Sequence, residues 1–318
     1  MIRTVKPKTA RSKRAMDKKE PQIVENPKMT LFLRGKKCSQ VVQLAMADLC
    51  SVKRPLSMKF TKKNAIHPFE DAASFEFFSE KNDASLLVFG CHSKKRPHCL
   101  TIARCLNHKL LDMLELYLDA ETFRTMSQFK TPKAAVGLKP LLSFSGTLFE
   151  SPTPNAYTLA KSLFVDLFRG QDTPQIDVEG LQYIINFAAS EEVEGQPPPQ
   201  IRVRSYRIVT KKSGQKLPRV EVEEMGPRMD LRIGRMQEAD ELILREALKK
   251  PRQLEPRTKK NIDMDIMGDK VGKIHVGQQD LSSLQTRKMK GLKRSRGDMD
   301  LDAETLVDEE MADTKRVR

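Results

Sequence analysis

Tryptophan is absent from this chain of 318 residues, and aromatic side chains make up only 6% of it. Long apolar runs are missing too, since no stretch approaches the roughly 18 consecutive apolar residues of a membrane span. The N-terminus is basic and polar, without the apolar segment of a secretory signal. Apolar residues nevertheless make up 39% of the chain, enough for a core of domain size. We therefore expect a soluble intracellular protein with one bilobed domain, or two small domains, and tails.

Cysteine is scarce, and its five residues form an odd number without any Cys-x-x-Cys pair. In an intracellular protein such thiols are normally reduced, so we expect no disulfide framework. Six possible metal ligands nevertheless gather in one stretch: Cys91, His92, His98, Cys99, Cys105 and His108. Their spacing matches no zinc motif, and strands would place them on alternating faces. We therefore expect neither a metal nor another cofactor.

Motifs of common active sites are also missing. The chain has no Gly-x-Ser-x-Gly elbow, no phosphate-binding Gly-x-x-x-x-Gly-Lys-Ser/Thr loop and no dinucleotide-binding Gly-x-Gly-x-x-Gly. One segment, His67-Pro68-Phe69-Glu70-Asp71, does place two carboxylates close to a histidine. Pro at the first helical position with acids in the first turn is also an ordinary helix start, and we prefer that interpretation. We expect the protein not to be an enzyme.

Positive charge is what the chain has in excess. Lys and Arg total 57 against 42 Asp and Glu, so the formal net charge is +15 and the isoelectric point is about 9.6. Such a balance favours polyanionic partners such as nucleic acid. Six cations within residues 287–296 suit a nuclear import signal, although the basic N-terminal arm is an alternative carrier of that signal.

Runs of charge mark the boundaries of the folded part. The first 20 residues hold eight cations and two acids, and seven acids without a base lie between Asp298 and Glu310. We therefore predict a disordered basic arm over residues 1–27, a folded domain over 28–250, and a disordered tail over 251–318 that is basic and then acidic.

The folded part contains a weak repeat with an offset of about 100 residues. Each half opens with a short apolar strand, Leu31–Gly35 in one and Leu141–Gly146 in the other. An amphipathic helix follows in each, with Ser39 as the expected N-cap of the first. We predict an α/β fold with two lobes, about 28–135 and 136–250. Unrelated α/β domains share this order of elements, so the residues alone leave duplication and coincidence both open.

The densest basic element is the loop His92–His98, which lies between two apolar strands. Three adjacent cations and a stiffening proline can meet several phosphates from one loop. The alternative is an ordinary solvated loop. Aromatic side chains are sparse nearby, which favours recognition of the backbone and shape of duplex RNA over stacking on single strands. The predicted RNA-binding residues are Lys94, Lys95, Arg96 and His98, supported by Arg34, Lys36, Lys37, Lys53, Arg54, Lys59, Lys62 and Lys63.

Many ordered segments over roughly residues 27–250 resemble the Brix-domain family of ribosome-assembly factors. The segments are His67–Asp71, Leu87–Gly90, Ser93–His98, Leu111–Met113 with Glu115, Gly137–Pro140, Phe144–Gly146, Val165–Gly170, Gly180-Leu181, Arg204–Tyr206, Pro218–Glu221 and Glu224–Pro227. One departure is that Cys91 and Cys99 stand where smaller or polar residues are common, which concerns the packing of the loop between them.

The resemblance implies a Brix domain of two similar α/β lobes, related in fold to anticodon-binding domains. Within the family, the chain looks like the member that forms a heterodimer with the regulator-of-ribosome-synthesis protein. The implied partners are 5S rRNA, pre-rRNA, that protein and the ribosomal proteins of the 5S particle, brought together on the precursor of the large (60S) subunit. The implied compartment is the nucleolus and nucleus, with no membrane partner.

Two alternatives to such an RNA–protein scaffold stay open at this point. One is an RNA-processing enzyme of the nucleolus, and the other is a protein-only adaptor without RNA contact. We also expect a partner chain to cover apolar surface, because the strands Leu31–Gly35 and Leu141–Gly146 are expected at or near sheet edges. A helix over Glu238–Leu248 is expected to close one lobe with its apolar stripe.

Overall fold

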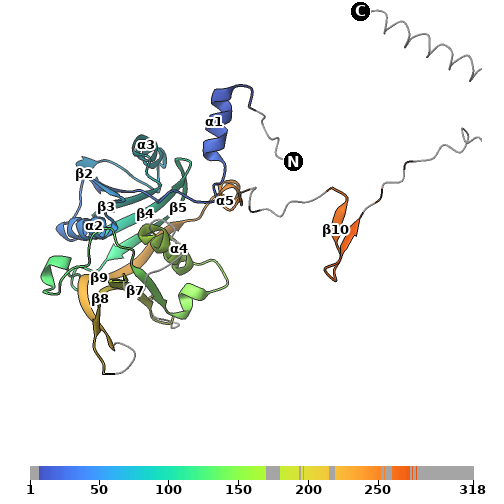
Figure 1. The fold of residues 1–318 in the computed structure, drawn as a ribbon. Coiled ribbons are helices and arrows are strands. Elements are labelled where there is room, and N and C mark those ends of the chain that lie inside the picture. Colours follow the sequence, from blue (N-terminus) through green and yellow to red (C-terminus); the bar gives the residue numbers. More distant parts are fainter. Residues whose placement is uncertain are drawn as a thin grey trace, which may run out of the picture. The chain divides into compact units, whose positions relative to one another are not determined.

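A computed structural model describes residues 7–169, 180–192, 195, 197–214, 219–251, 254, 260–272, 274 and 277. The chain divides into two compact units, Met1–Glu255 and Pro256–Arg318. The first unit contains a nine-stranded sheet with helices packed on it (Figure 1). The second contains a small hairpin of β10 (Ile262–Met264) and β11 (Lys270–Gly272).

The strands of the large sheet are β1 (Thr30–Gly35), β2 (Ser57–Asn64), β3 (Leu86–Cys91), β4 (Cys99–Leu106), β5 (Lys109–Leu118), β6 (Leu141–Ser145), β7 (Tyr183–Ala189), β8 (Ile201–Lys211) and β9 (Arg219–Gln237). The α-helices are α1 (Ala10–Lys19), α2 (Gln40–Lys53), α3 (Ala73–Asn82), α4 (Ala156–Phe168) and α5 (Glu241–Ala247). Two short 3₁₀ helices are η1 (Met126–Gln128) and η2 (Thr147–Glu150). None of the helices described here is long and apolar enough to cross a membrane.

The predicted repeat is confirmed by the topology of the sheet, whose strand order is β2-β1-β3-β4-β5-β9-β8-β7-β6. In the first half, β1 pairs in parallel with β3, and β4 and β5 follow antiparallel. In the second half, β6 pairs in parallel with β7, and β8 and β9 follow antiparallel. The halves join through the antiparallel pair β5–β9. Two similar α/β halves therefore share one sheet.

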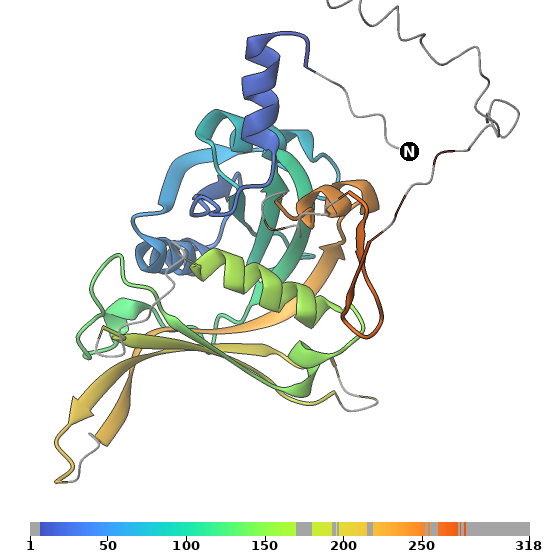
Figure 2. The same ribbon diagram turned by 45° about the vertical axis from the view of Figure 1, so that its right-hand side comes forward.

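One face of the sheet carries both α2 and α4, whose apolar residues form a single core with inward residues of strands from both halves. The opposite face is covered by α3 in the first half only, over a second core. Helix α2 approaches the sheet closely at Gly90, where a Cβ atom would lie 2.7 Å from Met46 and from Val42. Figure 2 shows α4 over the second half of the sheet, with no described helix on the other side of those strands.

Helix starts follow local capping chemistry. Ser39 is the N-cap of α2, as predicted, and its hydroxyl accepts a hydrogen bond from the backbone N–H of Val42. Asn155 is the N-cap of α4, and its side-chain oxygen accepts a hydrogen bond of 2.7 Å from the backbone N–H of Thr158. The segment His67–Asp71 is a turn that precedes α3, and Pro68 is not a helical residue. Asp71, which precedes the N-cap Ala72, accepts a hydrogen bond at 2.9 Å from the N–H of Ala73, the first residue of α3.

Each predicted tail contains one element of regular structure among the described residues. Helix α1 lies within the basic arm, because Thr9 and Ser12 form a capping box that satisfies the first N–H groups. The hairpin β10–β11 lies within the predicted tail. The basic segment 287–296 and the acidic block 298–310 fall outside the described residues.

The fold tests two expectations about the partner surface. Strand β6 is an edge strand and β1 lies next to the edge strand β2, so both strands are at or near a sheet edge, as predicted. Helix α5 has only seven residues and no buried side chain, and Leu242 is 64% exposed. This helix is too short to lay a continuous apolar stripe on the sheet, so it does not close a lobe.

Candidate nucleic-acid interface

The predicted basic loop connects β3 to β4 and is fixed at both of its ends. The N–H of His92 donates to the carbonyl of Lys37 at 2.8 Å, and the N–H of Leu118 donates to the carbonyl of His98 at 2.9 Å. Nδ1 of His98 lies 2.8 Å from the hydroxyl of Ser39, within hydrogen-bonding distance. The loop is therefore attached to the start of α2 and to the end of β5.

Within the loop, the backbone turns back on itself. Ser93 and Arg96 exchange backbone hydrogen bonds of 3.0 and 3.2 Å, and the Ser93 hydroxyl accepts a further bond from the N–H of Arg96. Lys94 and Lys95 occupy the tip of this turn and are exposed. Burial, followed by the charge of His92, lowers the pKa of the His98 imidazole, so His98 is a neutral hydrogen-bonding group near pH 7. The loop thus presents its cations on a defined turn.

Strand register brings further predicted cations to the same end of the sheet. Arg34 pairs with Gly90 at the end of β3 and with Lys63 at the end of β2. The N–H of Lys36 donates to the carbonyl of Asn64 at 3.0 Å, which joins the two strand ends. We call the resulting set the basic cluster: Arg34, Lys36, Lys37, Lys62, Lys63, Lys94, Lys95 and Arg96.

The basic cluster has little neutralisation from neighbouring carboxylates. In the part of the chain that the structure describes, none of its eight cations forms an ion pair. Five of the eight lie in connecting loops, and the other three lie within the last three residues of β1 or β2. The parallel strands β1, β2 and β3 end at the same side of the sheet. Concentrated, unpaired positive charge of this kind attracts phosphate groups.

Three predicted cations do not join the cluster. Lys53 is buried at the opposite end of the sheet, where its Nζ donates to the backbone carbonyl of Arg169 at 3.1 Å. Burial lowers the pKa of this ammonium to about 8, although the charge of Asp166 opposes the shift. Arg54 is exposed at that same end, and Lys59 is exposed in the middle of β2. Lys53 therefore cannot make the predicted phosphate contact, because its ammonium group is buried and bound to a backbone carbonyl.

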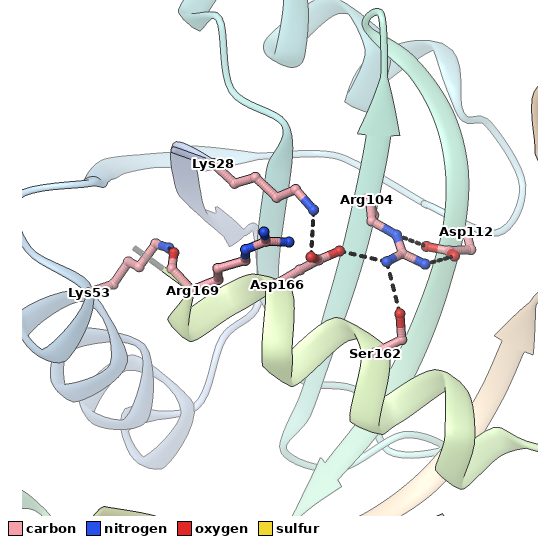
Figure 3. Close-up of polar contacts among 7 residues, drawn as sticks. All are labelled: Lys28, Lys53, Arg104, Asp112, Ser162, Asp166 and Arg169. Atoms are coloured by element: carbon pink, nitrogen blue, oxygen red, sulfur yellow. Dashed lines mark hydrogen bonds and ion pairs between the residues drawn. The ribbon is translucent and has the colours of Figure 1, made fainter. Parts of the chain in front are cut away.

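A polar network near Lys53 joins the two halves and was not anticipated (Figure 3). Arg104 of β4 lies 2.5 Å from a carboxylate oxygen of Asp112 and 2.5 Å from one of Asp166. Lys28, ahead of β1, contacts the other oxygen of Asp166 at 2.5 Å. Burial would raise the pKa of Asp166, but the hydrogen bonds from Lys28 and Arg104 outweigh it and hold the pKa below its usual value. The network supports the fold rather than forming a binding site.

The six possible metal ligands noted in the sequence are placed as ordinary strand and loop residues. No group of three or more possible ligands converges in the part of the chain described here. All five cysteines are free thiols, and Sγ of Cys99 donates to a carboxylate oxygen of Glu115 at 3.0 Å. Burial raises the pKa of Cys38 to about 11 and that of Cys105 to about 12, which keeps both thiols protonated near pH 7.

Sequence reasoning missed the arginines of β8 and β9. Arg202 and Arg204 alternate with buried Ile201 and Val203 in β8, and a similar alternation occurs in β9. Alternation of charged and apolar residues is the signal of a strand with one open face, and it was readable from the sequence. These arginines stand apart from the runs of adjacent charges that mark the basic loop.

Comparison with known proteins gives a consistent picture. The family model described as "Brix domain" matches residues 35–235. "Ribosome production factor 2 homolog" of Chaetomium thermophilum is 54% identical, over 93% of this chain and 92% of that protein. "Ribosome biogenesis protein RPF2" of Saccharomyces cerevisiae is 48% identical, over 92% and 86%. "Ribosome production factor 2 homolog" of Homo sapiens is 40% identical, over 85% of each chain.

Proposed function

The chain belongs to the Brix-domain family, and from that premise we propose that it is a non-catalytic assembly factor of the large ribosomal subunit. In this role it binds structured RNA, namely 5S rRNA and pre-rRNA, and holds it against protein partners. The observation that carries the proposal is the basic cluster, where eight cations that form no ion pair among the described residues gather at one end of the sheet. The names of its relatives support the link to ribosome production.

The protein partners in this proposal are the regulator-of-ribosome-synthesis protein and the ribosomal proteins of the 5S particle. The free edge of β6 supports binding of a partner chain, because an edge strand presents unpaired backbone groups. The compartment that fits this role is the nucleolus within the nucleus. Imaging of the tagged full-length chain checks this, and a uniform cytoplasmic signal would contradict it.

The decisive test of RNA binding removes the charges of the loop. Lys94, Lys95 and Arg96 are changed together to Ala in the full chain, and binding of a 5S rRNA transcript is measured from 50 to 300 mM salt. Each lost phosphate contact flattens the logarithmic salt dependence by about 0.7–0.9, so the slope should fall by about 2. Thermal stability should stay nearly constant, since Lys94 and Lys95 are exposed and Arg96 forms no ion pair among the residues described.

The matched control changes three exposed lysines away from the cluster, Lys81, Lys109 and Lys249, to Ala. Lys109 starts β5, at the end of the sheet opposite to the loop. The control variant should keep the wild-type slope. A folded loop variant with an unaltered slope contradicts the loop as an RNA site. Absence of salt-dependent RNA retention by the wild type would favour a protein-only adaptor, and turnover of RNA would favour an enzyme.

A further inference from the structure

The basic loop begins and ends at a pair of cysteines that face each other in the sheet. Cys91 is the last residue of β3, Cys99 is the first residue of β4, and the two are direct partners in the antiparallel register. Direct partners in an antiparallel pair have Cα atoms about 4.5–5.5 Å apart, and a disulfide needs a Cα–Cα distance of about 4.4–6.8 Å. The sheet therefore already holds the two residues at the separation that a disulfide requires.

Both cysteines lie on the face of the sheet that α3 covers. Cys91 packs against the core on that face. Cys99 alternates along β4 with Leu100, which belongs to the core under α2, so the side chain of Cys99 lies on the α3 face as well. Cys38 is also close to the loop, but it packs against the core under α2, on the other side of the sheet. Cys99, rather than Cys38, is therefore the thiol within reach of Cys91.

The two thiols differ in acidity and in access to solvent. Cys91 is partly exposed, whereas Cys99 is fully buried. A hydrogen bond from Cys99 is the main cause that lowers the pKa of the Cys91 thiol. Burial and Glu115 oppose this shift, and the charges of Arg96 and Arg235 add to it. The same hydrogen bond, followed by burial, raises the pKa of Cys99. Since the thiolate is the nucleophilic form, Cys91 is the reactive member of the pair and Cys99 stays protonated beside it.

The proton of Cys99 has two acceptors and serves one of them at a time. Sγ of Cys99 lies 3.0 Å from a carboxylate oxygen of Glu115 and donates to it while Cys91 is protonated. The proton turns to the sulfur of Cys91 when that group is a thiolate. Arg235 keeps Glu115 paired through a contact of 2.8 Å. The buried thiol can therefore turn toward Cys91 without leaving a buried carboxylate unpaired.

We propose that Cys91 and Cys99 form a thiol oxidation site, at which hydrogen peroxide drives a disulfide across the base of the basic loop. The Cys91 thiolate attacks one oxygen of the peroxide, the O–O bond breaks, and the departing hydroxide takes up a proton to become water. The sulfur of Cys99 then attacks the sulfenic sulfur of Cys91. The S–O bond breaks, and the leaving oxygen takes the proton of Cys99 and departs as a second water. Two thiols and one peroxide thus give one disulfide and two waters.

The site is coupled to the basic cluster through Arg96, which lies inside the loop that the disulfide closes. This coupling rests on the proposed RNA-binding function. The charge of Arg96 favours the thiolate of Cys91, and RNA phosphates on the loop neutralise that charge. Bound RNA also covers the base of the loop. Both effects slow the reaction with peroxide, so the thiols are oxidised mainly while the loop is empty of RNA.

The test treats the reduced full chain with hydrogen peroxide and blocks the remaining thiols with N-ethylmaleimide. The intact mass should then show two fewer blocked thiols than the five of the reduced chain. Trypsin cleaves after Lys94 and Lys95, so Cys91 and Cys99 fall on separate peptides, 82–94 and 96–104. These peptides should appear as one linked species that reduction separates. Absence of the linked species, or oxidation of Cys91 to a sulfinic acid in its place, overturns the inference.

Serine variants identify the partner thiol. Cys91→Ser and Cys99→Ser should each abolish the linked species, and Cys99→Ser should accumulate a sulfenic acid at Cys91 that reacts with dimedone. The matched control is Cys38→Ser, which removes another partly exposed thiol next to the loop anchor Lys37 and should keep the linked species. A disulfide that joins Cys91 to Cys38 contradicts the proposed pair.

Protection by RNA separates this inference from the proposed function. A 5S rRNA transcript should slow formation of the linked species several-fold at low salt, and the protection should vanish at the salt concentration that releases the RNA. If RNA binds but does not slow the reaction, the coupling to the basic cluster is overturned. If RNA does not bind and the linked species still forms, the proposed function fails while the thiol site stands. If RNA binds and no linked species forms, the thiol site fails while the proposed function stands.

Discussion

At the scale of single residues, Asp166 shows how the two halves are joined. Its carboxylate accepts from Lys28 ahead of the first half and from Arg104 of β4, while the residue itself belongs to α4 of the second half. The side chain is only 9% exposed, so removing its charge leaves two cations facing each other in a poorly solvated place. The ion pairs of this residue therefore hold α4 against the first half.

Changing Asp166→Asn should lower the free energy of unfolding at pH 7 by about 3 kcal/mol, the size of breaking a buried ion pair. The pKa of Asp166 is lowered in the folded state from its usual 3.8, so its contribution is present above that pH and is lost as the pH falls below it. Denaturant unfolding at several pH values should show the difference from wild type shrinking below about pH 4.

A control for this prediction is Asp83→Asn, whose carboxylate is 97% exposed. Its effect should stay within about 0.5 kcal/mol at every pH. Equal stability of the Asp166 and Asp83 variants at pH 7 would mean that the network in Figure 3 contributes nothing to holding the halves together.

At the scale of elements, the predictable parts were those with local chemical markers. Ser39 marks the start of α2, and the apolar runs of β1 and β3 mark buried strands. Lys53 was misplaced because the end of a helix is compatible with either exposure or burial until its neighbours are known. Helix α1 was missed because its residues are mostly basic and polar and show no run of apolar positions. The capping box of Thr9 and Ser12 is the local signal that marks its start.

The basic cluster was largely predictable from the sequence, whereas the placement of Arg202 close to Arg232 was not. Lys94, Lys95 and Arg96 are adjacent in sequence, so they stay together in any fold. Arg202 and Arg232 meet only because β8 and β9 pair in one specific register, with Arg202 opposite Asp230. The strands β8 and β9 are consecutive in the chain, so the alternation of their arginines is visible in the sequence, but the register of the pair is not.

The two edge strands of the sheet differ in a way that predicts where a partner strand is added. Strand β2 carries Lys59, Lys62 and Lys63, and lysines blunt an edge against pairing. Strand β6 carries no charged residue, so its edge is free to pair. Changing Leu141 and Ser143 of β6 to Lys should therefore weaken retention of the co-expressed regulator-of-ribosome-synthesis protein by at least tenfold, measured by pull-down.

The matched control adds lysines at Met58 and Thr61 of β2, the opposite edge, and should retain the partner fully. Before partner binding is compared, both double variants must have melting temperatures close to that of the wild type. Equal loss of partner from the two variants would mean that added charge, rather than the edge of β6, weakens the complex.

At the scale of the whole molecule, several apolar surfaces lack cover within the described part of the chain. Strands β8 and β9 extend beyond β7 as a two-stranded arm, on which Val220 is 59% and Val222 is 55% exposed. A two-stranded ribbon is marginally stable in water unless something packs against it. Together with the free edge of β6, the arm is the surface that we expect the proposed partner chain to cover.

The last prediction follows from that incompleteness. The chain expressed alone should aggregate or melt several degrees below its complex with the regulator-of-ribosome-synthesis protein, because exposed Val220, Val222 and β6 would be covered in the complex. Burial of apolar surface is not screened by salt, so the complex should survive size-exclusion chromatography in about 1 M salt, where the Debye length is only ~3 Å. RNA bound to the basic cluster should leave under the same conditions, which makes it an internal control. A monodisperse, equally heat-stable chain whose partner dissociates in salt would instead assign the attachment to electrostatics.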